Sequence, residues 1–195
     1  LYRACVSEGV NLSFGLLADL PVADSAEADG DEALIRPVRE AVTRLNRRYG
    51  GRLYLFTRGR SFDGERYSPR ERKRGAIMEL AKLICDEPSE LEVTGERDAL
   101  IGTKYILTLD SDTRIYPGAA GELIGAMLHP LNRPVIDART KTVTTGHAIV
   151  HPRIDTELSS SAETDFALIF AGAGGSDPYG SLCGELYMDA FSSGG

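Results

Sequence analysis

The residues best suited to chemistry are two aspartates one residue apart, Asp110 and Asp112, in the segment YILTLDSDTR. They follow an apolar run, Lys104 to Leu109, whose length and composition predict a short buried strand. Two carboxylates this close repel each other unless a cation lies between them or water solvates each one. Mg²⁺ or Mn²⁺ is commonly held by one or two carboxylates and the phosphate oxygens of a substrate. The spacing therefore favours a site for a metal ion and a diphosphate; the alternative is that Asp112 only caps the next turn.

A third carboxylate, Asp19, lies at the end of the apolar run Asn11 to Leu20. The length and composition of this run predict a strand buried on both faces. In α/β sheets, ligands bind outside the carboxyl ends of the strands. Because Asp19, Asp110 and Asp112 are all predicted at such ends, this edge of the sheet is the candidate site.

A basic segment could supply the cations of such a site. The chain has a net charge of −7, yet residues 36–74 contain 13 Lys and Arg against 4 Asp and Glu. An acidic chain with one basic segment is unlike a general nucleic-acid-binding domain, so we expect no nucleic-acid partner. Arg72, Lys73 and Arg74 begin a predicted helix, where cations oppose the helix dipole and anions bind. A role in anion binding would explain them; the alternative is a solvated charged surface.

Hydrophobic periodicity predicts the elements that position these residues. The predicted helices span residues 31–49, 71–85, 117–129, 162–171 and 182–191. The predicted strands span residues 11–20, 52–57, 104–109 and 143–150. Residues 58–70 are polar and are predicted to be an exposed loop. Strands that alternate with helices predict an α/β fold with a mainly parallel sheet and helices on both faces.

Length and composition fit one domain over residues 1–195, of which 42% are hydrophobic. No run approaches the roughly 18 apolar residues of a membrane span, and no signal peptide opens the chain. The chain begins at Leu1 without Met, so we expect an excised, soluble piece of a longer protein. The cysteines, Cys5, Cys85 and Cys183, are odd in number without paired spacing. They predict a reducing compartment and buried thiols rather than disulfides or a zinc site.

Two enzyme classes use an aspartate pair at a strand end. Phosphatases of the haloacid dehalogenase type have D-x-D-x-T/V, usually on the first strand of the domain. Here Arg114 occupies the Thr/Val position, and the motif follows about a hundred residues of α/β pattern. Nucleotide-sugar transferases with the GT-A fold place D-x-D after several strands, as in this chain. The transferase interpretation is therefore favoured, and the phosphatase is the alternative.

Longer stretches of the chain resemble the glycosyltransferase domain of cyclic β-1,2-glucan synthases, of the glycosyltransferase family 84 type. They are LSFGLLADL, RLYLFTR, ERKRGAIMELAKLI, YILTLDSDTRIYPGAAGELIGAMLHPLNRP and GSDPYGSLCGELYMDAFSSGG. The resemblance implies a GT-A-like fold, truncated at both ends, within a large multidomain bacterial membrane protein, on the cytoplasmic face of the inner membrane. It also implies an inverting transferase that uses UDP-glucose, a glucan acceptor and Mn²⁺ or Mg²⁺ to build β-1,2-glucan.

The resemblance also implies roles for individual residues. Asp19 would contact the uracil ring, while Lys73, together with Arg74, would lie on the diphosphate side. Asp110 would contact the nucleotide or sugar and help to hold the metal ion, which Asp112 would ligate. The metal ion would stabilise the leaving UDP as the glycosidic bond breaks.

Smaller features are open to more than one interpretation. Asp177 and Tyr179 belong to the glycine-rich segment GAGGSDPYG, which could wrap the sugar or simply form a turn before a helix. His147 and His151 are four residues apart in a predicted strand, where they would lie ~13 Å apart, so a structural or surface role is favoured over metal binding. His129 at a predicted helix end can interact favourably with the helix dipole.

The resemblance predicts no catalytic residue within the chain. The motif that carries the general base of an inverting enzyme is expected beyond the C-terminal end, so the isolated chain should bind UDP-glucose weakly and not turn over. The strand that normally opens a GT-A sheet is also expected to be absent, and the edge left exposed could pair two chains into a dimer. A third hypothesis is a noncatalytic scaffold or acceptor-binding piece of a larger synthase.

Overall fold

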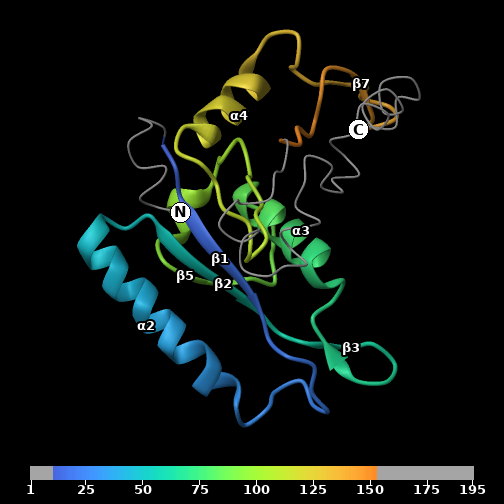
Figure 1. The fold of residues 1–195 in the computed structure, drawn as a ribbon. Helices are drawn as coiled ribbons and strands as arrows, with labels where there is room; N and C mark the ends of the chain where they lie inside the picture. The colour runs from blue at the N-terminus through green and yellow to red at the C-terminus, as the bar shows by residue number, and fades with distance from the viewer. Residues whose placement is uncertain (1–10, 153–195) are drawn as a thin grey trace, which may run out of the picture. The chain divides into compact units, whose positions relative to one another are not determined.

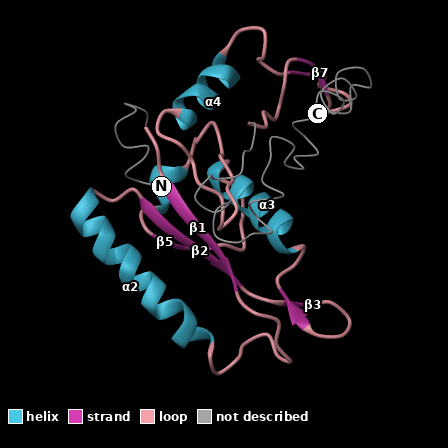
Figure 2. Ribbon diagram, in the orientation of Figure 1, coloured by secondary structure: helices cyan, strands magenta, loops and turns pink. Residues whose placement is uncertain are grey.

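The computed structural model describes residues 11–152 of the chain. Its elements, in chain order, are β1 (Phe14–Asp19), α2 (Asp31–Tyr49), β2 (Leu53–Arg58), β3 (Ser61–Phe62), β4 (Tyr67–Ser68), α3 (Arg72–Ile84), β5 (Glu92–Thr94), the 3₁₀ helix η2 (Arg97–Leu100), α4 (Ala119–Leu128), β6 (Val135–Ile136) and β7 (Val143–Thr145) (Figures 1 and 2). The helices predicted at 162–171 and 182–191 lie outside the described residues. The chain divides into two compact units, Leu1–Pro117 and Gly118–Gly195. The single domain predicted from the sequence stays a prediction.

The main sheet of the first unit has the strand order β1-β2-β5. β1 pairs with β2 in parallel, from Phe14 opposite Leu53 to Asp19 opposite Arg58, whereas β5 is antiparallel to β2. The short pairs β3–β4 and β6–β7 are antiparallel as well. The mixed α/β class is therefore confirmed. In the main sheet the longer pairing, β1–β2, is parallel as predicted, whereas β2–β5 is antiparallel, and the GT-A-like fold stays a prediction. Residues 92–94, which lie outside every predicted strand, return along β2 as an antiparallel strand.

The central strand β2 is covered on both faces. Leu55 and Thr57 face α2, where they line a pocket with Val38, while Tyr54 and Phe56 pack toward Leu83 of α3. Figure 1 shows α2 and α3 on opposite sides of the sheet, as the sequence predicted.

The edge strand β1 differs from its prediction as a strand buried on both faces. Leu16, in its middle, is exposed to solvent. The reason is that α2 makes its main contacts with β2 and β5, and it meets β1 only at a pocket beside the carboxyl end of that strand.

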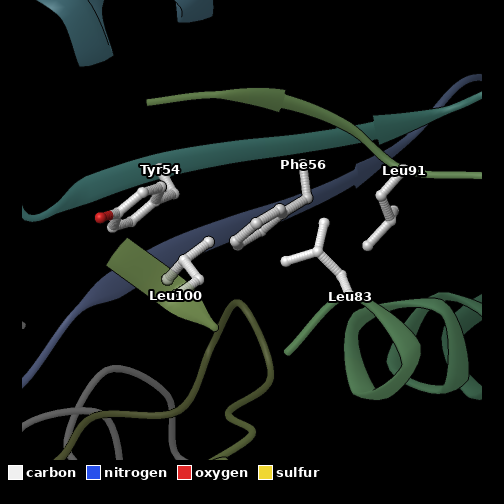
Figure 3. Packing of buried hydrophobic residues seen from close by; sticks show 5 residues of the cluster. All are labelled: Tyr54, Phe56, Leu83, Leu91 and Leu100. Atoms are coloured by element: carbon white, nitrogen blue, oxygen red, sulfur yellow. The ribbon is translucent and has the colours of Figure 1, made fainter. Parts of the chain in front are cut away.

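The core of the first unit is a cluster between the sheet and α3 (Figure 3). Its buried members are Tyr54, Phe56, Leu83, Leu91 and Leu100. The rings of Tyr54 and Phe56 stack with centroids 6.0 Å apart. Burial of these apolar side chains fixes α3 against the sheet and so positions the start of α3 beside the carboxyl ends of β1 and β2.

The observed bounds of α2 match the predicted range, and local features of the sequence mark both ends. Two acidic residues lie in its first turn, and Gly50 ends it in the left-handed conformation at φ 82°, donating its N–H to the Asn46 carbonyl. The Asn46 side chain also exchanges two hydrogen bonds with the Leu53 backbone, at 2.7 and 2.8 Å. Asn46 therefore ties the end of α2 to the start of β2.

The segment 104–109, predicted as a strand, contains no strand in the structure. Both Ile106 and Leu107 are exposed rather than buried. A short apolar run becomes a strand only where a neighbouring strand supplies hydrogen bonds, and within residues 11–152 no strand pairs with this segment. Cys85, predicted to be a buried thiol, is exposed just after α3; Cys5 and Cys183 lie outside the described residues.

The second unit contains the predicted helix, observed as α4, and the hairpin β6–β7. His129 directly follows α4, at the predicted helix end. The predicted strand at 143–150 is observed over Val143–Thr145 alone, so His147 and His151 lie beyond it. Across residues 11–152, no helix is both long enough and apolar enough to cross a membrane.

Candidate functional site

Two of the predicted site residues are in direct contact. Lys73, in the first turn of α3, donates a hydrogen bond to Oδ1 of Asp110, 37 residues further along the chain. The Lys73 and Asp110 side chains are 57% and 64% exposed, so water screens this ion pair. A solvent-exposed pair contributes only about 0–1 kcal/mol, so either partner can exchange the other for a ligand at little cost.

The D-x-D pair lies in an exposed turn. The Thr113 N–H donates to the Asp110 carbonyl at 3.0 Å, and Asp112 is exposed within this turn. Between residues 11 and 152, no three His, Cys, Asp or Glu side chains gather closely enough to hold a metal ion. Metal binding by Asp110 and Asp112 therefore stays a prediction. It would require Mg²⁺ or Mn²⁺ ligated by one or two carboxylates, with the remaining positions taken by phosphate oxygens and water.

Asp19 is paired with an arginine that the sequence analysis assigned to an exposed loop. Arg58, the last residue of β2, is only 3% exposed, and it donates from Nε and Nη2 to the two carboxylate oxygens of Asp19 at 2.7 and 2.8 Å. The parallel register places the two residues opposite each other. This pairing raises the pKa of Arg58 above its ordinary value. The sequence signal that could have revealed this pair is that each strand ends in a charged residue, Asp19 on β1 and Arg58 on β2.

Arg58 also donates to the turn that begins α3. Its Nη1 binds the Arg70 carbonyl at 2.7 Å, and its Nη2 binds the Arg72 carbonyl. Lys73 is the next residue along the chain. The contacts therefore run from Asp19 through Arg58 to the start of α3, where Lys73 binds Asp110. Asp19, Lys73 and Asp110 therefore lie in one region of the first unit, although only Asp19 is at the end of an observed strand.

Asp19 also lines an apolar pocket of about 240 Å³. The pocket lies between the carboxyl end of β1 and α2, and Leu34, Ile35 and Val38 of α2 form its apolar wall. The Asp19 side chain is 28% exposed. A carboxylate oxygen has two acceptor sites, so each oxygen keeps one after bonding to Arg58. The predicted contact with a planar base stays a prediction.

The remaining predicted donor residues are not drawn into these contacts. Arg74 is exposed and donates to Glu71 at 2.6 Å, three residues before it. Asp177 and Tyr179 lie outside the described residues. Glu71 and Arg72 also line an open pocket of about 630 Å³ beside the β3–β4 hairpin.

A second buried arginine, Arg60, was also missed by the sequence analysis. Its side chain is 1% exposed and makes two hydrogen bonds of 2.6 Å to the Asp31 carboxylate. It also donates to the Pro21 and Ala26 carbonyls at 2.5 and 3.1 Å. Arg60 thus anchors the loop between β1 and α2. Two of the arginines in the basic segment therefore serve the fold and are not free to bind anions.

The Asp31–Arg60 pair should make stability fall between about pH 4 and pH 2. The hydrogen bonds from Arg60, followed by that from the Ala28 N–H, lower the pKa of Asp31 from 3.8 to about 2. A carboxyl group with a lowered folded-state pKa stabilises the fold above its unfolded-state pKa, and this contribution is lost as the pH falls through the folded-state pKa.

Thermal unfolding measured from pH 6 to pH 2 would check this. The decrease in Tm below pH 4 should be smaller in Asp31→Asn than in the wild type. Asp29→Asn, at an exposed aspartate two residues earlier, should follow the wild type. Identical profiles for all three proteins would show that Asp31 does not contribute.

Comparison with known proteins gives one line of support for a functional class. No protein-family model matches the chain. It is 32% identical over 188 residues to the cyclic β-(1,2)-glucan synthase NdvB of Rhizobium meliloti (strain 1021). The alignment covers 93% of this chain and 7% of that protein. This similarity supports a relationship to glucan synthases and is consistent with a part of a larger multidomain protein. It does not favour the phosphatase alternative.

Proposed function

We propose that this chain is part of a glycosyltransferase domain of the family 84 type, which transfers glucose from UDP-glucose into β-1,2-glucan with inversion and has a GT-A fold. The similarity to a glucan synthase over 93% of the chain carries this proposal. The contact between Lys73 and Asp110 supports it, because it joins a cation at a helix start to the D-x-D turn. The whole protein would lie at the cytoplasmic face of the bacterial inner membrane.

The residues of the first unit have distinct roles in this proposal. Asp110 and Asp112 would hold Mn²⁺ or Mg²⁺, which when bound supplies positive charge for the leaving diphosphate. Lys73 would exchange its exposed contact with Asp110 for a phosphate oxygen, helped by the positive end of the α3 dipole. Asp19 would accept a hydrogen bond from uracil with its remaining acceptor sites. We place the general base outside this chain, so we expect donor binding without glucan synthesis.

Replacement of Asp112 by alanine should abolish metal-dependent binding of UDP-glucose. The substitution removes one of the two carboxylates proposed to hold the metal ion, and we expect at least a tenfold loss of affinity, equivalent to about 1.4 kcal/mol. Calorimetric titration of UDP-glucose with and without Mn²⁺ would measure this. Asp29→Ala, at an exposed aspartate preceding α2, is the matched control and should bind as the wild type does.

Nucleotide selectivity gives a second arm of the same experiment. UDP should bind more tightly than GDP in the presence of Mn²⁺. Weak binding of all nucleotides regardless of metal, unchanged in Asp112→Ala, would contradict the proposed donor site.

A further inference from the structure

We propose that Arg58 is a positioning residue of the donor site: it holds the turn from which Lys73 extends, without itself touching the ligand. The inference rests on the proposed function, because Lys73 is the residue proposed to bind the diphosphate. It assigns a role to a residue that the sequence analysis placed in an exposed loop.

The hydrogen bonds of Arg58 join two separate parts of the fold. The guanidinium binds the Asp19 carboxylate at the end of β1 and, with other N–H groups, the carbonyls of Arg70 and Arg72. A planar guanidinium has five donors in a fixed arrangement, so one side chain can bind a carboxylate and two carbonyls at once. Because the side chain is buried, solvent does not replace these bonds.

The turn held by Arg58 has an unfavourable backbone conformation. Glu71 and Arg72 have φ angles of 53° and 45°, in the left-handed region that residues with side chains rarely adopt. Such a conformation persists where surrounding contacts enforce it, and it is concentrated at functional sites. The two carbonyls that Arg58 binds are those of Arg70 and Arg72, on either side of Glu71. Arg58 therefore supplies contacts that hold this turn.

Close packing at Gly75 shows how tightly the same region is built. A Cβ atom at this position would lie 2.1 Å from the Arg70 carbonyl oxygen and 2.7 Å from Nη1 of Arg58. The first turn of α3 thus lies directly against the hydrogen bond between these two groups. Since Lys73 lies between Arg72 and Gly75, displacement of the turn would displace Lys73 relative to Asp110.

Arg60 provides a matched control for Arg58. Both are buried arginines on the same chain segment, and each makes a two-pronged pair with an aspartate and donates to two carbonyls. Arg60, however, binds Asp31 and the loop between β1 and α2. A lysine at either position keeps the charge but cannot reproduce the planar arrangement of donors. Both substitutions should lower Tm, and only the one at Arg58 should affect the donor site.

The test compares Arg58→Lys with Arg60→Lys at a temperature where both are folded. We expect UDP affinity in the presence of Mn²⁺ to fall about tenfold in Arg58→Lys. A loss of this size is usual when a residue that orients a ligand-binding group, without touching the ligand, is replaced. Amide hydrogen exchange at residues 72–75 should also become faster in this variant. Arg60→Lys should change neither measurement.

Further outcomes separate this inference from the proposed function. Equal losses of affinity in both variants, or no loss in Arg58→Lys, would overturn the positioning role while leaving the donor site in place. Absence of UDP binding by the wild type with Mn²⁺ would overturn the proposed function and the positioning role with it.

If Arg58→Lys does not fold, a second variant tests the same contact. The Cβ atom of Gly75→Ala would displace the hydrogen bond between Arg58 and the Arg70 carbonyl, while the Arg58 and Asp19 charges are retained. Its UDP affinity should fall, and unchanged affinity would overturn the inference.

Discussion

Replacement of Phe56 by alanine is expected to lower the free energy of unfolding by about 3–5 kcal/mol, the usual cost of removing a buried phenyl ring. Phe56 is 4% exposed in the centre of the main cluster, where its ring stacks on that of Tyr54 and lies over Gly15. The ring projects from the central strand of a three-stranded sheet. Few neighbouring elements could therefore shift to fill the cavity that its removal would leave. Urea denaturation followed by circular dichroism would measure the loss.

The matched control for this prediction is Phe62→Ala. Phe62 lies on the short strand β3 and is 59% exposed, with Tyr67 as its ring partner at 5.3 Å between centroids. Loss of this partner should cost only about 0.5–1.5 kcal/mol. Similar losses at the two positions would contradict the assignment of the core to the cluster around Phe56.

Replacement of Gly75 by alanine is expected to destabilise the chain by about 1–3 kcal/mol, as overpacking generally does. The sign is opposite to that of intrinsic helix propensity, which favours alanine over glycine by about 1 kcal/mol. The reason is the backbone oxygen of Arg70, which would lie 2.1 Å from the new Cβ and cannot rotate away as a side chain can. Thermal and urea unfolding of the variant would check the sign.

Gly125→Ala is the control for Gly75→Ala. Gly125 is also within a helix, α4. Apart from its chain neighbours and the backbone of its own helix, no atom would lie within 4 Å of a Cβ atom at this position. Propensity then decides the result, so this substitution should stabilise α4 by up to about 1 kcal/mol. A stabilising effect at both glycines would show that Gly75 is not close-packed against the turn.

The helices were predictable because their causes are local. Apolar residues at three- and four-residue spacing predicted α2, and the same periodicity predicted α3 to within one residue at each end. The β1 and β2 segments were found from short apolar runs. The sequence also pointed to Asp19 and Asp110 as charged residues at the ends of apolar runs, and to Lys73 as a cation at a predicted helix start, because these are local features; their roles stay predictions.

Strand pairing was less predictable, because it depends on residues far apart in the chain. β5 joined the sheet as an antiparallel strand from a segment rich in acidic residues, whereas the apolar segment 104–109 did not become a strand. Composition indicates that a segment can form a strand, but hydrogen bonds to a neighbouring strand decide whether it does. The order β1-β2-β5 leaves β1 at an edge, and the dimer predicted through such an edge stays a prediction.

By itself, the sequence determined the mixed α/β class, the bounds of α2, α3 and α4 to within two residues, and which acidic and basic residues are candidates for a site, all of which follow from short-range spacing. Only the tertiary structure decided which charged side chains are buried in ion pairs that stabilise the fold. The register of β1 against β2 places Asp19 opposite Arg58 and buries that arginine, while the packing of α3 brings Lys73 to Asp110. The Lys73–Asp110 contact joins residues that are 37 positions apart in the chain, and the Asp19–Arg58 contact joins residues that are 39 positions apart. No local sequence pattern encodes such contacts.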